Sequence, residues 1–514
     1  MMRKTSALPS AAGALLAVLG DPPATLGRAI RRTVQGLCWA GVLISLTGEA
    51  QAAPAPPPGR SVRKPVRRLP LAVRRPAKGT RPVPIHPVKP PSTAPIPDVE
   101  PPPAGEIAVQ WARPLQPHAG AKVRAYPTHG APALGDMRGD TAIALKLDPP
   151  KRGGAGCRGW FAVLPDGFVC QDQVRVQPGY LSSPPAQARA KGWQRMRYGV
   201  VRAETAVLES SPGGTATRPV AEAGYLRGTL RRGDGVTVVR EREDRVQIFS
   251  RHWLRRGDVT LASPSPMAPI NLQALPVGQR LMVAWVVPPQ GETQTRLALP
   301  GMSGPGVMLP RYTPLYWSDV RPSQGRTVVH LTDEARAILA GKPEAQAAAF
   351  EIDSTQLRRI TPAQPPSGLH PDERWIDISV SEQVAVAYQG DAPLFAALVS
   401  TGAHGATPPG TFWVYRKYLS QTMANMRGAA SQYDFREVPH AQFFNGRIGL
   451  HAVLWHDLLG HPVSHGCVNM SPATAEQFFS FTKPDLPAGW HTVNGDPPHR
   501  GAPWLRGTRI VVRK

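Results

Sequence analysis

Prolines and glycines break this sequence into short apolar runs, and this constrains its fold more than any other feature. The 514 residues include 59 prolines and 49 glycines, which end helices and interrupt central strands. Short apolar runs between turn residues are typical of β-strands. Because one hydrophobic core rarely organises so long a chain, several folded units joined by linkers are expected. We therefore predict a mainly β protein built from small modules.

The N-terminal segment 1–52 has the pattern of an export signal. Arginines precede an apolar run at 36–46, and Ala50-Gln51-Ala52 offers the small-x-small pattern of a cleavage site. The apolar run is too short for a comfortable membrane span. We predict a signal peptide over 1–52, which is either cleaved near Ala52 or kept as an anchor.

Segment 53–118 is predicted to be a disordered, Pro/Arg-rich linker. The chain carries a net charge of +24, and residues from Arg60 to Lys89 include ten Lys or Arg and no acidic residue. Such a segment buries too little apolar surface to fold. It is a plain spacer, or a spacer whose charge also attracts anionic wall polymers or the envelope surface. Nucleic acid is not a predicted partner, because no recognition helix or zinc module accompanies the basic residues.

Three modules are predicted between the linker and the C-terminal domain. Segments 119–180 and 196–265 consist of short strand-like runs and weakly resemble bacterial SH3-like modules; the alternative is a structural β-domain without a ligand. Cys157 and Cys170 flank two such runs, so we predict a disulfide across neighbouring strands. A metal site would need further ligands, and the sequence offers none nearby. Segment 268–366 is predicted to be an α+β module, with a helical stretch around 332–350.

Segment 372–514 is predicted to be a β-sandwich-like domain with one or two short helices. Ile376, Ile378 and Val380 alternate with polar residues, and Gly390-Asp391 follows as the turn of a hairpin. Ser471-Pro472 supplies the N-cap and first turn of a helix that ends near Phe481.

One motif in this domain contains the residue types that a cysteine nucleophile needs. His451 precedes Cys467 by sixteen positions, and Cys467 lies in Ser464-His465-Gly466-Cys467-Val468-Asn469. The thiolate is the reactive form of cysteine, so we expect an imidazole or amide dipoles to lower the pKa of Cys467. His451 can act as base and then as acid, and Gly466 permits the tight turn of an oxyanion hole. Two alternatives are an inert core cysteine and a zinc site of His451, His465 and Cys467, although the spacing matches no recognised zinc motif.

Together with Ser400-Thr401-Gly402 and Thr407-Pro408-Pro409-Gly410, this motif resembles the L,D-transpeptidase catalytic domain family from Trp375 to Lys514. The segments Trp455 to Gly460 and Pro487 to His491 are similar to one subgroup. The resemblance implies that the carbonyl of Ala452 orients the His451 ring and that neither a metal nor an organic cofactor takes part. It implies a catalytic set of Cys467, His451, His465, Ser464 and Gly466, and a substrate-binding set of Asn469, Trp455, His456 and Phe444.

The resemblance also implies the reaction. Cys467 would attack a peptidoglycan tetrapeptide stem, expel the terminal D-alanine and pass the stem to an acceptor amine, giving a cross-link or an anchored protein. The alternatives are an L,D-carboxypeptidase or cysteine peptidase, in which water accepts the acyl group, and a non-catalytic SH3-like wall-binding scaffold. Stem peptides are the predicted partner, and the periplasm or cell wall of a bacterium is the predicted location. The acceptor and the oligomeric state stay open.

Overall fold

The computed structural model describes residues 108–115, 120–138, 141–154, 156–180, 197–207, 229–248, 252–300, 306–319, 325–424, 433–495 and 505–514. All of them belong to the second of the chain's two units, Pro97–Lys514. The predicted signal peptide 1–52 and most of the predicted linker 53–118 lie outside the described residues. Within the described part, none of the helices reaches the length and hydropathy of a membrane span.

The first module begins earlier than the sequence predicts. Strand β1 lies inside the predicted linker 53–118 and pairs with β8 along its whole length and with β4. Its Trp111 is buried, and the surrounding prolines and arginines hide this short apolar run in the sequence. The strands are β1 (Ala108–Pro114), β2 (Ala121–Arg124), β3 (Ala133–Met137), β4 (Ile143–Ala144), β5 (Lys151–Gly154), β6 (Cys157–Ala162), β7 (Phe168–Cys170) and β8 (Val174–Tyr180).

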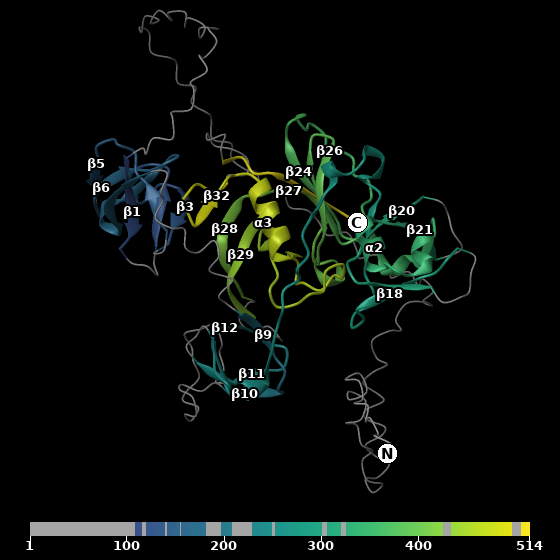
Figure 1. The fold of residues 1–514 in the computed structure, drawn as a ribbon. Helices are drawn as coiled ribbons and strands as arrows, with labels where there is room; N and C mark the ends of the chain where they lie inside the picture. Colours follow the sequence, from purple (N-terminus) through teal and green to yellow (C-terminus); the bar gives the residue numbers. More distant parts are fainter. Residues whose placement is uncertain are drawn as a thin grey trace, which may run out of the picture. The chain divides into compact units, whose positions relative to one another are not determined.

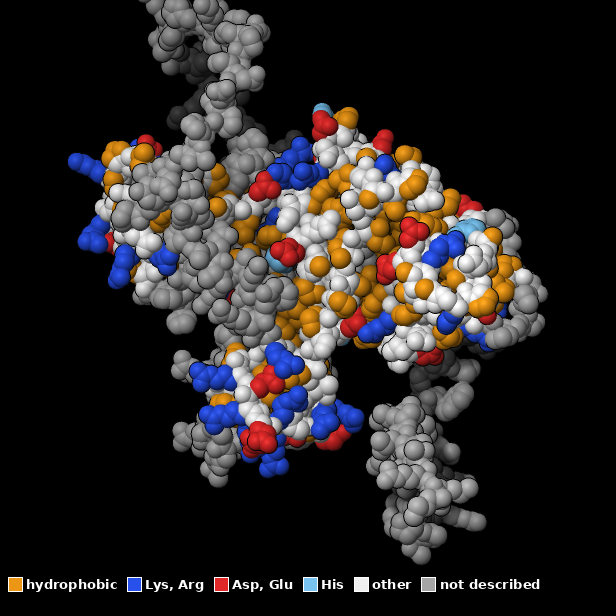
Figure 2. All heavy atoms as spheres, in the orientation of Figure 1, with side chains coloured by type: hydrophobic (Ala, Val, Ile, Leu, Met, Phe, Trp, Pro, Cys, Tyr) orange, Lys and Arg blue, Asp and Glu red, His pale blue; other side chains and the backbone are white. Residues whose placement is uncertain are grey.

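The second module, residues 197–261, is a small antiparallel β unit with its own apolar core. Val201, Leu230, Val236 and Leu254 are among the buried residues of this core. Arginine side chains mix with Asp and Glu over its outer surface (Figure 2). Its strands are β9 (Arg197–Val201), β10 (Thr205–Val207), β11 (Thr229–Arg231), β12 (Gly235–Glu241), β13 (Arg245–Ile248), β14 (Trp253–Arg255) and β15 (Val259–Leu261).

The third module is α+β, but its helix is much shorter than the sequence predicts. The predicted helical stretch 332–350 contains only α2 (Asp333–Ile338), a 3₁₀ turn and the start of β22. Gly341 and Pro343 explain the difference, because both residues oppose continuation of a helix. The strands are β16 (Ile270–Asn271), β17 (Val283–Val286), β18 (Gln294–Leu297), β19 (Val307–Pro310), β20 (Pro314–Trp317), β21 (Arg326–Leu331), β22 (Phe350–Asp353) and β23 (Leu357–Arg359).

The C-terminal domain packs one sheet against another, as predicted. One sheet runs in the order β16-β26-β25-β24-β33-β27, and the other contains β28, β29, β30 and β31. The elements, which Figure 1 labels in part, are β24 (Arg374–Ser379), β25 (Val384–Gln389), β26 (Ala392–Leu398), β27 (Gly410–Trp413), β28 (Arg416–Ala424), β29 (Tyr433–Asn445), β30 (Ile448–Ala452), β31 (Val468–Met470), α3 (Pro472–Phe481), β32 (Thr492–Asn494) and β33 (Arg509–Arg513).

The core of this domain lies between the two sheets and under α3. Ile376 and Ala385 from one sheet join Leu450 and Val468 from the other, and Phe478 enters from the helix. The predicted N-cap of this helix is confirmed, because the Ser471 hydroxyl accepts the backbone N–H of Thr474. Burial on this scale holds β30 and β31 at a fixed place in the domain.

Strand pairing joins the first two modules to the C-terminal domain. In the first module, β3 pairs with β32 through Gly135 and Asp136. In the second module, β12 pairs with β29 in parallel through Gly235 and Val236. Strands β2, β3 and β5–β7 of the first module and β9 and β12–β15 of the second module therefore belong to the same hydrogen-bonded sheet as β28–β32 of the C-terminal domain.

The segment Pro487 to His491 docks the first module. A Cβ at Gly489, whose φ is +80°, would lie 1.7 Å from the carbonyl oxygen of Ala142. Next to it, the buried Trp490 donates its indole N–H to the carbonyl of Leu164. Only glycine fits at position 489, since every other residue would force the two backbones apart.

Gly489→Ala is expected to destabilise the protein, because it adds a backbone clash to the cost of a left-handed φ. We expect a loss of about 3 kcal/mol in the free energy of unfolding, measured by thermal and denaturant melts. Gly291→Ala is the matched control, because Gly291 also has a positive φ but a Cβ there meets no atom within 4 Å. Equal melting of the two variants would show that the docking contact is unimportant.

Candidate active site

Parallel pairing of β30 with β31 brings the motif residues together. The register places His451 opposite Asn469 and Leu450 opposite Val468. Cys467 comes directly before β31, on the same edge as His451, and both residues line one cavity. Within the described residues, Cys467 is the cysteine outside the disulfide, and it is half-buried.

The geometry of His451 fixes which ring nitrogen is basic. Its Nδ1 lies 2.9 Å from the carbonyl oxygen of Ala452, the contact that the family resemblance implies. A carbonyl only accepts, so Nδ1 carries the proton and Nε2 keeps its lone pair. Burial of the ring lowers the pKa of His451 to about 4, although the Ala452 bond opposes the shift. His451 is therefore a neutral base at pH 7.

The pKa of Cys467 departs from the sequence expectation. Burial raises the pKa of the thiol above its ordinary value, while the backbone N–H of Gly449 and the positive charge of Arg447 act in the opposite direction. The thiol lies 3.6 Å from the carbonyl oxygen of Arg447. Of the two expected causes of a lowered pKa, the backbone N–H of Gly449 acts in the expected direction, whereas a neutral His451 offers no positive charge to stabilise a thiolate.

The turn that carries Cys467 is held by hydrogen bonds to two hydroxyl groups, those of Ser464 and Thr407. The Ser464 hydroxyl donates to the carbonyl of Cys467 at 2.5 Å and accepts the backbone N–H of Gly466 at 3.0 Å. Gly466 has a φ of +135°, which side-chain-bearing residues rarely adopt. The Thr407 hydroxyl donates to the Gly466 carbonyl at 2.7 Å. Ser464, Gly466 and Thr407 thus fix the path of the backbone into Cys467.

The Ser400-Thr401-Gly402 segment binds the other side of this turn. Ser400 exchanges backbone hydrogen bonds with Asn469, and Thr401 accepts the backbone N–H of Ser464. The buried Gln383 side chain donates to the Thr401 hydroxyl and accepts the Thr401 backbone N–H. The Cys467 turn is therefore held between β30 on one side and residues 400–402 on the other.

The half-buried His456 and the buried Asn469 form a polar pair beside His451. The nearest contact joins Asn469 Nδ2 and His456 Nε2 at 3.0 Å. His456 Nδ1 accepts the backbone N–H of Leu458. Burial, and then the proximity of His451, lower the pKa of His456 to about 4. A neutral ring that accepts at Nδ1 carries its proton on Nε2, so the Asn469 amide must present its oxygen to it.

The third module anchors the loop that carries Trp455 and His456. Arg311 forms an ion pair with Asp457 and also donates to the Asp457 backbone carbonyl. The Tyr312 hydroxyl donates to the same carbonyl at 3.0 Å, and Arg358 donates to the Gly460 carbonyl at 2.9 Å. Asp457 and Gly460 of the Trp-His-Asp-x-x-Gly segment thus serve as docking points for this module.

The cavity at Cys467 encloses about 750 Å³. Of the predicted substrate-binding residues, Asn469, Trp455 and His456 line it; Phe444 does not. Phe444 is buried in the core between the sheets, where its ring packs against Phe412, because the alternation of β29 points it away from the cavity. Its neighbour Phe443 lines the cavity instead. The other predicted residues on its wall are His451, Ser464, His465 and Cys467.

Several cavity residues carry no sequence signal that marks them. Arg447 and Tyr418 were not predicted, and neither were the second-module residues Val200 and Gly235. Tyr433 packs against the exposed His465 ring, with centroids 5.6 Å apart. Val200 and Gly235 lie some two hundred residues before the motif in the sequence, so only tertiary structure brings them to the cavity.

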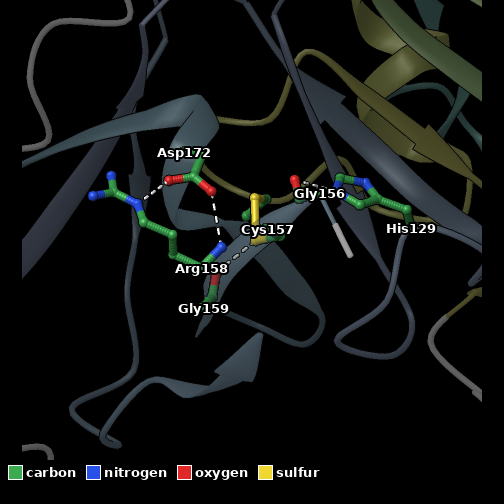
Figure 3. Close-up of a disulfide and its surroundings, with 7 residues drawn as sticks. His129, Gly156, Cys157, Arg158, Gly159 and Asp172 are labelled. Atoms are coloured by element: carbon green, nitrogen blue, oxygen red, sulfur yellow. Dashed lines mark hydrogen bonds and ion pairs between the residues drawn. A yellow bond between two sulfur atoms is a disulfide. The ribbon is translucent and has the colours of Figure 1, made fainter. Parts of the chain in front are cut away.

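The predicted disulfide is confirmed, and it has a histidine beside it. Cys157 and Cys170 are bonded, with Cα atoms 5.9 Å apart. His129 lies next to the sulfurs, and its Nε2 is 3.0 Å from the Gly156 carbonyl oxygen (Figure 3). In the described residues, His129, Cys157 and Cys170 are the one group whose ligand atoms come within 4.8 Å of one another. The sequence analysis did not identify His129 as a neighbour of the two cysteines. The group is not a metal site of cysteine thiolates, because both sulfurs are bonded to each other in the disulfide.

Comparison with known proteins identifies the family of the C-terminal domain. Residues 373–512 match the family model described as the L,D-transpeptidase catalytic domain. This segment is an L,D-transpeptidase domain, and the predicted family is confirmed for it. No curated protein matches the chain.

Solved structures of L,D-transpeptidases are similar to parts of the chain. One from Mycobacterium smegmatis is 18% identical, with a TM-score of 0.22, over 39% of this chain and 100% of that one. A catalytic domain from E. faecium, acylated by ertapenem, is 20% identical, with a TM-score of 0.20, over 24% and 98%. One from Stackebrandtia nassauensis is 18% identical, with a TM-score of 0.20, over 28% and 58%.

Alkylation of Cys467 by iodoacetamide should be slow at neutral pH and rise through an apparent pKa above that of an ordinary thiol. The reason is that burial disfavours the thiolate while His451 is uncharged above about pH 4. Peptide mapping by mass spectrometry at a series of pH values measures the rate at this cysteine alone. A plateau of full reactivity below pH 7 would instead indicate a preformed thiolate–imidazolium pair.

Proposed function

We propose that the protein is a peptidoglycan L,D-transpeptidase in which Cys467 is the nucleophile and His451 its base. The observation that carries the proposal is that His451, whose Nδ1 is held by the Ala452 carbonyl so that Nε2 is the basic nitrogen, lines the same cavity as Cys467. The family of residues 373–512 supports the reaction class. The substrate and the roles of individual residues are our proposal.

The proposed acylation begins with a thiol and a neutral base. As Cys467 Sγ bonds to the carbonyl carbon of the stem peptide, the thiol proton passes to His451 Nε2. The backbone N–H of Gly466 is already bonded to Ser464, so we propose the Cys467 backbone N–H as a donor to the oxyanion. The C–N bond then breaks, and the amine of D-alanine leaves with the proton from Nε2. A thioester on Cys467 remains.

The second half of the reaction reverses these roles. An acceptor amine attacks the thioester carbon and gives a proton to His451 Nε2. The C–S bond breaks, and the proton returns to the thiol as it leaves. If water attacks in place of the amine, the same residues perform hydrolysis, so the carboxypeptidase alternative shares this site and differs only in the acceptor.

The charge of the cavity favours an anionic peptide. Among the described residues that line it, Arg416 and Arg447 carry the guanidinium groups, and none is Asp or Glu. Both arginines are exposed, and the charge of Arg447 reaches the Cys467 thiol. We propose that Arg447 binds a carboxylate of the stem, such as that of the terminal D-alanine, because guanidinium groups match carboxylates.

The proposed location is the envelope of a bacterium. The disulfide between Cys157 and Cys170 is of the kind that forms outside the cytosol, and the family acts on the wall. The predicted signal peptide 1–52 fits this location, and the basic segment 53–118 would add an attraction to anionic polymers that weakens with salt.

A carbapenem such as ertapenem should acylate Cys467, which would appear as an added mass on the intact protein. The Cys467→Ala variant should show no adduct. His451→Gln retains the shape of a neutral side chain but not the base, so its acylation should be slower by about a hundredfold or more. An adduct that survives in Cys467→Ala would refute the nucleophile.

Arg447→Gln should raise the KM for a tetrapeptide with a free terminal carboxylate by about tenfold, since it removes one charge-assisted contact. Arg447→Lys should recover part of the loss. The same peptide with an amidated C-terminus should bind the wild type and Arg447→Gln equally. If Arg447→Gln loses as much affinity for the amidated peptide, Arg447 does not bind the carboxylate.

A further inference from the structure

We infer that the second module, residues 197–261, is a fixed wall of the active-site cavity that positions the aromatic side chains beside His451. Its residues Val200, Gly233 and Gly235 line the same cavity as Cys467. The inference goes beyond the proposed reaction, because it assigns to this module a role in shaping the site in place of independent wall binding.

The first step is a backbone junction between this module and strand β29. Gly235 and Val236 of β12 pair in parallel with Tyr433 and Asp434. The Thr237 hydroxyl accepts the backbone N–H of Arg436 at 2.7 Å and donates to the Asp434 carbonyl at 3.3 Å. Backbone pairing and a side-chain bond therefore hold the start of β29 against the module.

A tyrosine of the module strengthens the same junction. The Tyr198 hydroxyl donates to the Arg436 carbonyl at 2.8 Å, and its ring is almost fully buried. The ring belongs to an apolar cluster that also contains Phe435, Val438 and Leu454 of the C-terminal domain. A core shared in this way opposes independent motion of the two parts, because separation would expose it to water.

The second step is the close packing of the Phe435 ring against Gly235. A Cβ at position 235 would lie 2.2 Å from the tip of the Phe435 ring, well inside van der Waals contact. The ring therefore lies directly on the backbone of the module. Even alanine at position 235 would push it away.

The third step leads from Phe435 to the proposed base. Phe435 stacks on Trp455 with ring centroids 3.9 Å apart and planes at 7°. Trp455 in turn lies 5.9 Å from the His451 ring, centroid to centroid. A displaced Phe435 would therefore move Trp455, whose ring packs beside His451 and forms part of the cavity wall.

These contacts make Gly235 and Thr237 positioning residues. They touch neither the thiol nor the imidazole, so their substitution should change how peptide is held more than how the thiol reacts. We expect Gly235→Ala to push Phe435 toward Trp455 and narrow the cavity. A misplacement of this kind costs at least about tenfold in kcat/KM.

The test compares Gly235→Ala with Gly257→Ala, a control in the same module where a Cβ meets only a flexible arginine at 3.9 Å. In Gly235→Ala the KM for the tetrapeptide should rise and kcat should change little, while iodoacetamide alkylates Cys467 at the wild-type rate. The control should match the wild type in all three. A folded Gly235→Ala with a wild-type KM would overturn the inference.

Two further measurements keep the test decisive. If Gly235→Ala does not fold, Thr237→Val removes only the hydroxyl contacts at the junction, and its KM should also rise; an unchanged KM would contradict the inference. If the wild type turns over no peptide, the proposed function fails. The inference about the second module can still be tested, by comparing the rates at which N-phenylmaleimide and iodoacetamide alkylate Cys467. Gly235→Ala should slow alkylation by the bulky N-phenylmaleimide more than alkylation by iodoacetamide. If both reagents are slowed equally, or neither is slowed, the inference that the second module forms a wall of the cavity is wrong.

Discussion

The site depends on one backbone constraint, the parallel pairing of β30 with β31. Sixteen positions separate His451 from Cys467 in the sequence, and only this register returns the chain to the same edge. Parallel strands need a crossover connection, which here is the loop that carries Trp455, His456 and Asp457. The connection that makes the pairing possible thus also supplies a wall of the cavity.

Burial around this pairing sets the chemistry of the pair. It lowers the pKa of His451 and raises that of Cys467, so both groups are neutral near pH 7. A neutral pair avoids the cost of two buried charges, and in the proposed mechanism the proton passes to His451 as the thiol attacks. The tautomer set by the Ala452 carbonyl is then essential, since it leaves Nε2 free to take the proton.

Close backbone contacts tie the modules to this domain. Gly489 lies against Ala142 of the first module, and Gly460 against Val287 of the third. Gly235 of the second module accepts the ring of Phe435 in the same way. These glycines are the places where a neighbouring segment comes closer than a side chain would allow, so substitutions at them are expected to affect the site from a distance.

The sequence predicts the local features of the fold well. Alternation and turn residues predict the Gly390-Asp391 hairpin, and Ser471 predicts the start of α3, because each signal acts over a few neighbouring residues. The Ser-His-Gly-Cys motif likewise points to Cys467 and His451, whose roles remain our proposal. β1 was missed because its apolar run is short and lies next to a proline-rich stretch.

Features that depend on contacts between distant segments could not be predicted. Phe444 and Phe443 are adjacent and equally apolar, and only the facing of β29 decides which one lines the cavity. Gln383, Arg447 and Gly235 belong to no recognisable motif, so their place at the site follows from the tertiary structure alone. The neutral state of Cys467 likewise depends on burial, which the motif does not encode.

A crystal structure of the free protein would test the central claim most directly, through the distance between His451 Nε2 and Cys467 Sγ. The account predicts that these atoms lie within about 4 Å of each other, or share one bridging water, with Nδ1 still on the Ala452 carbonyl. A separation beyond about 6 Å with no water between them would contradict it.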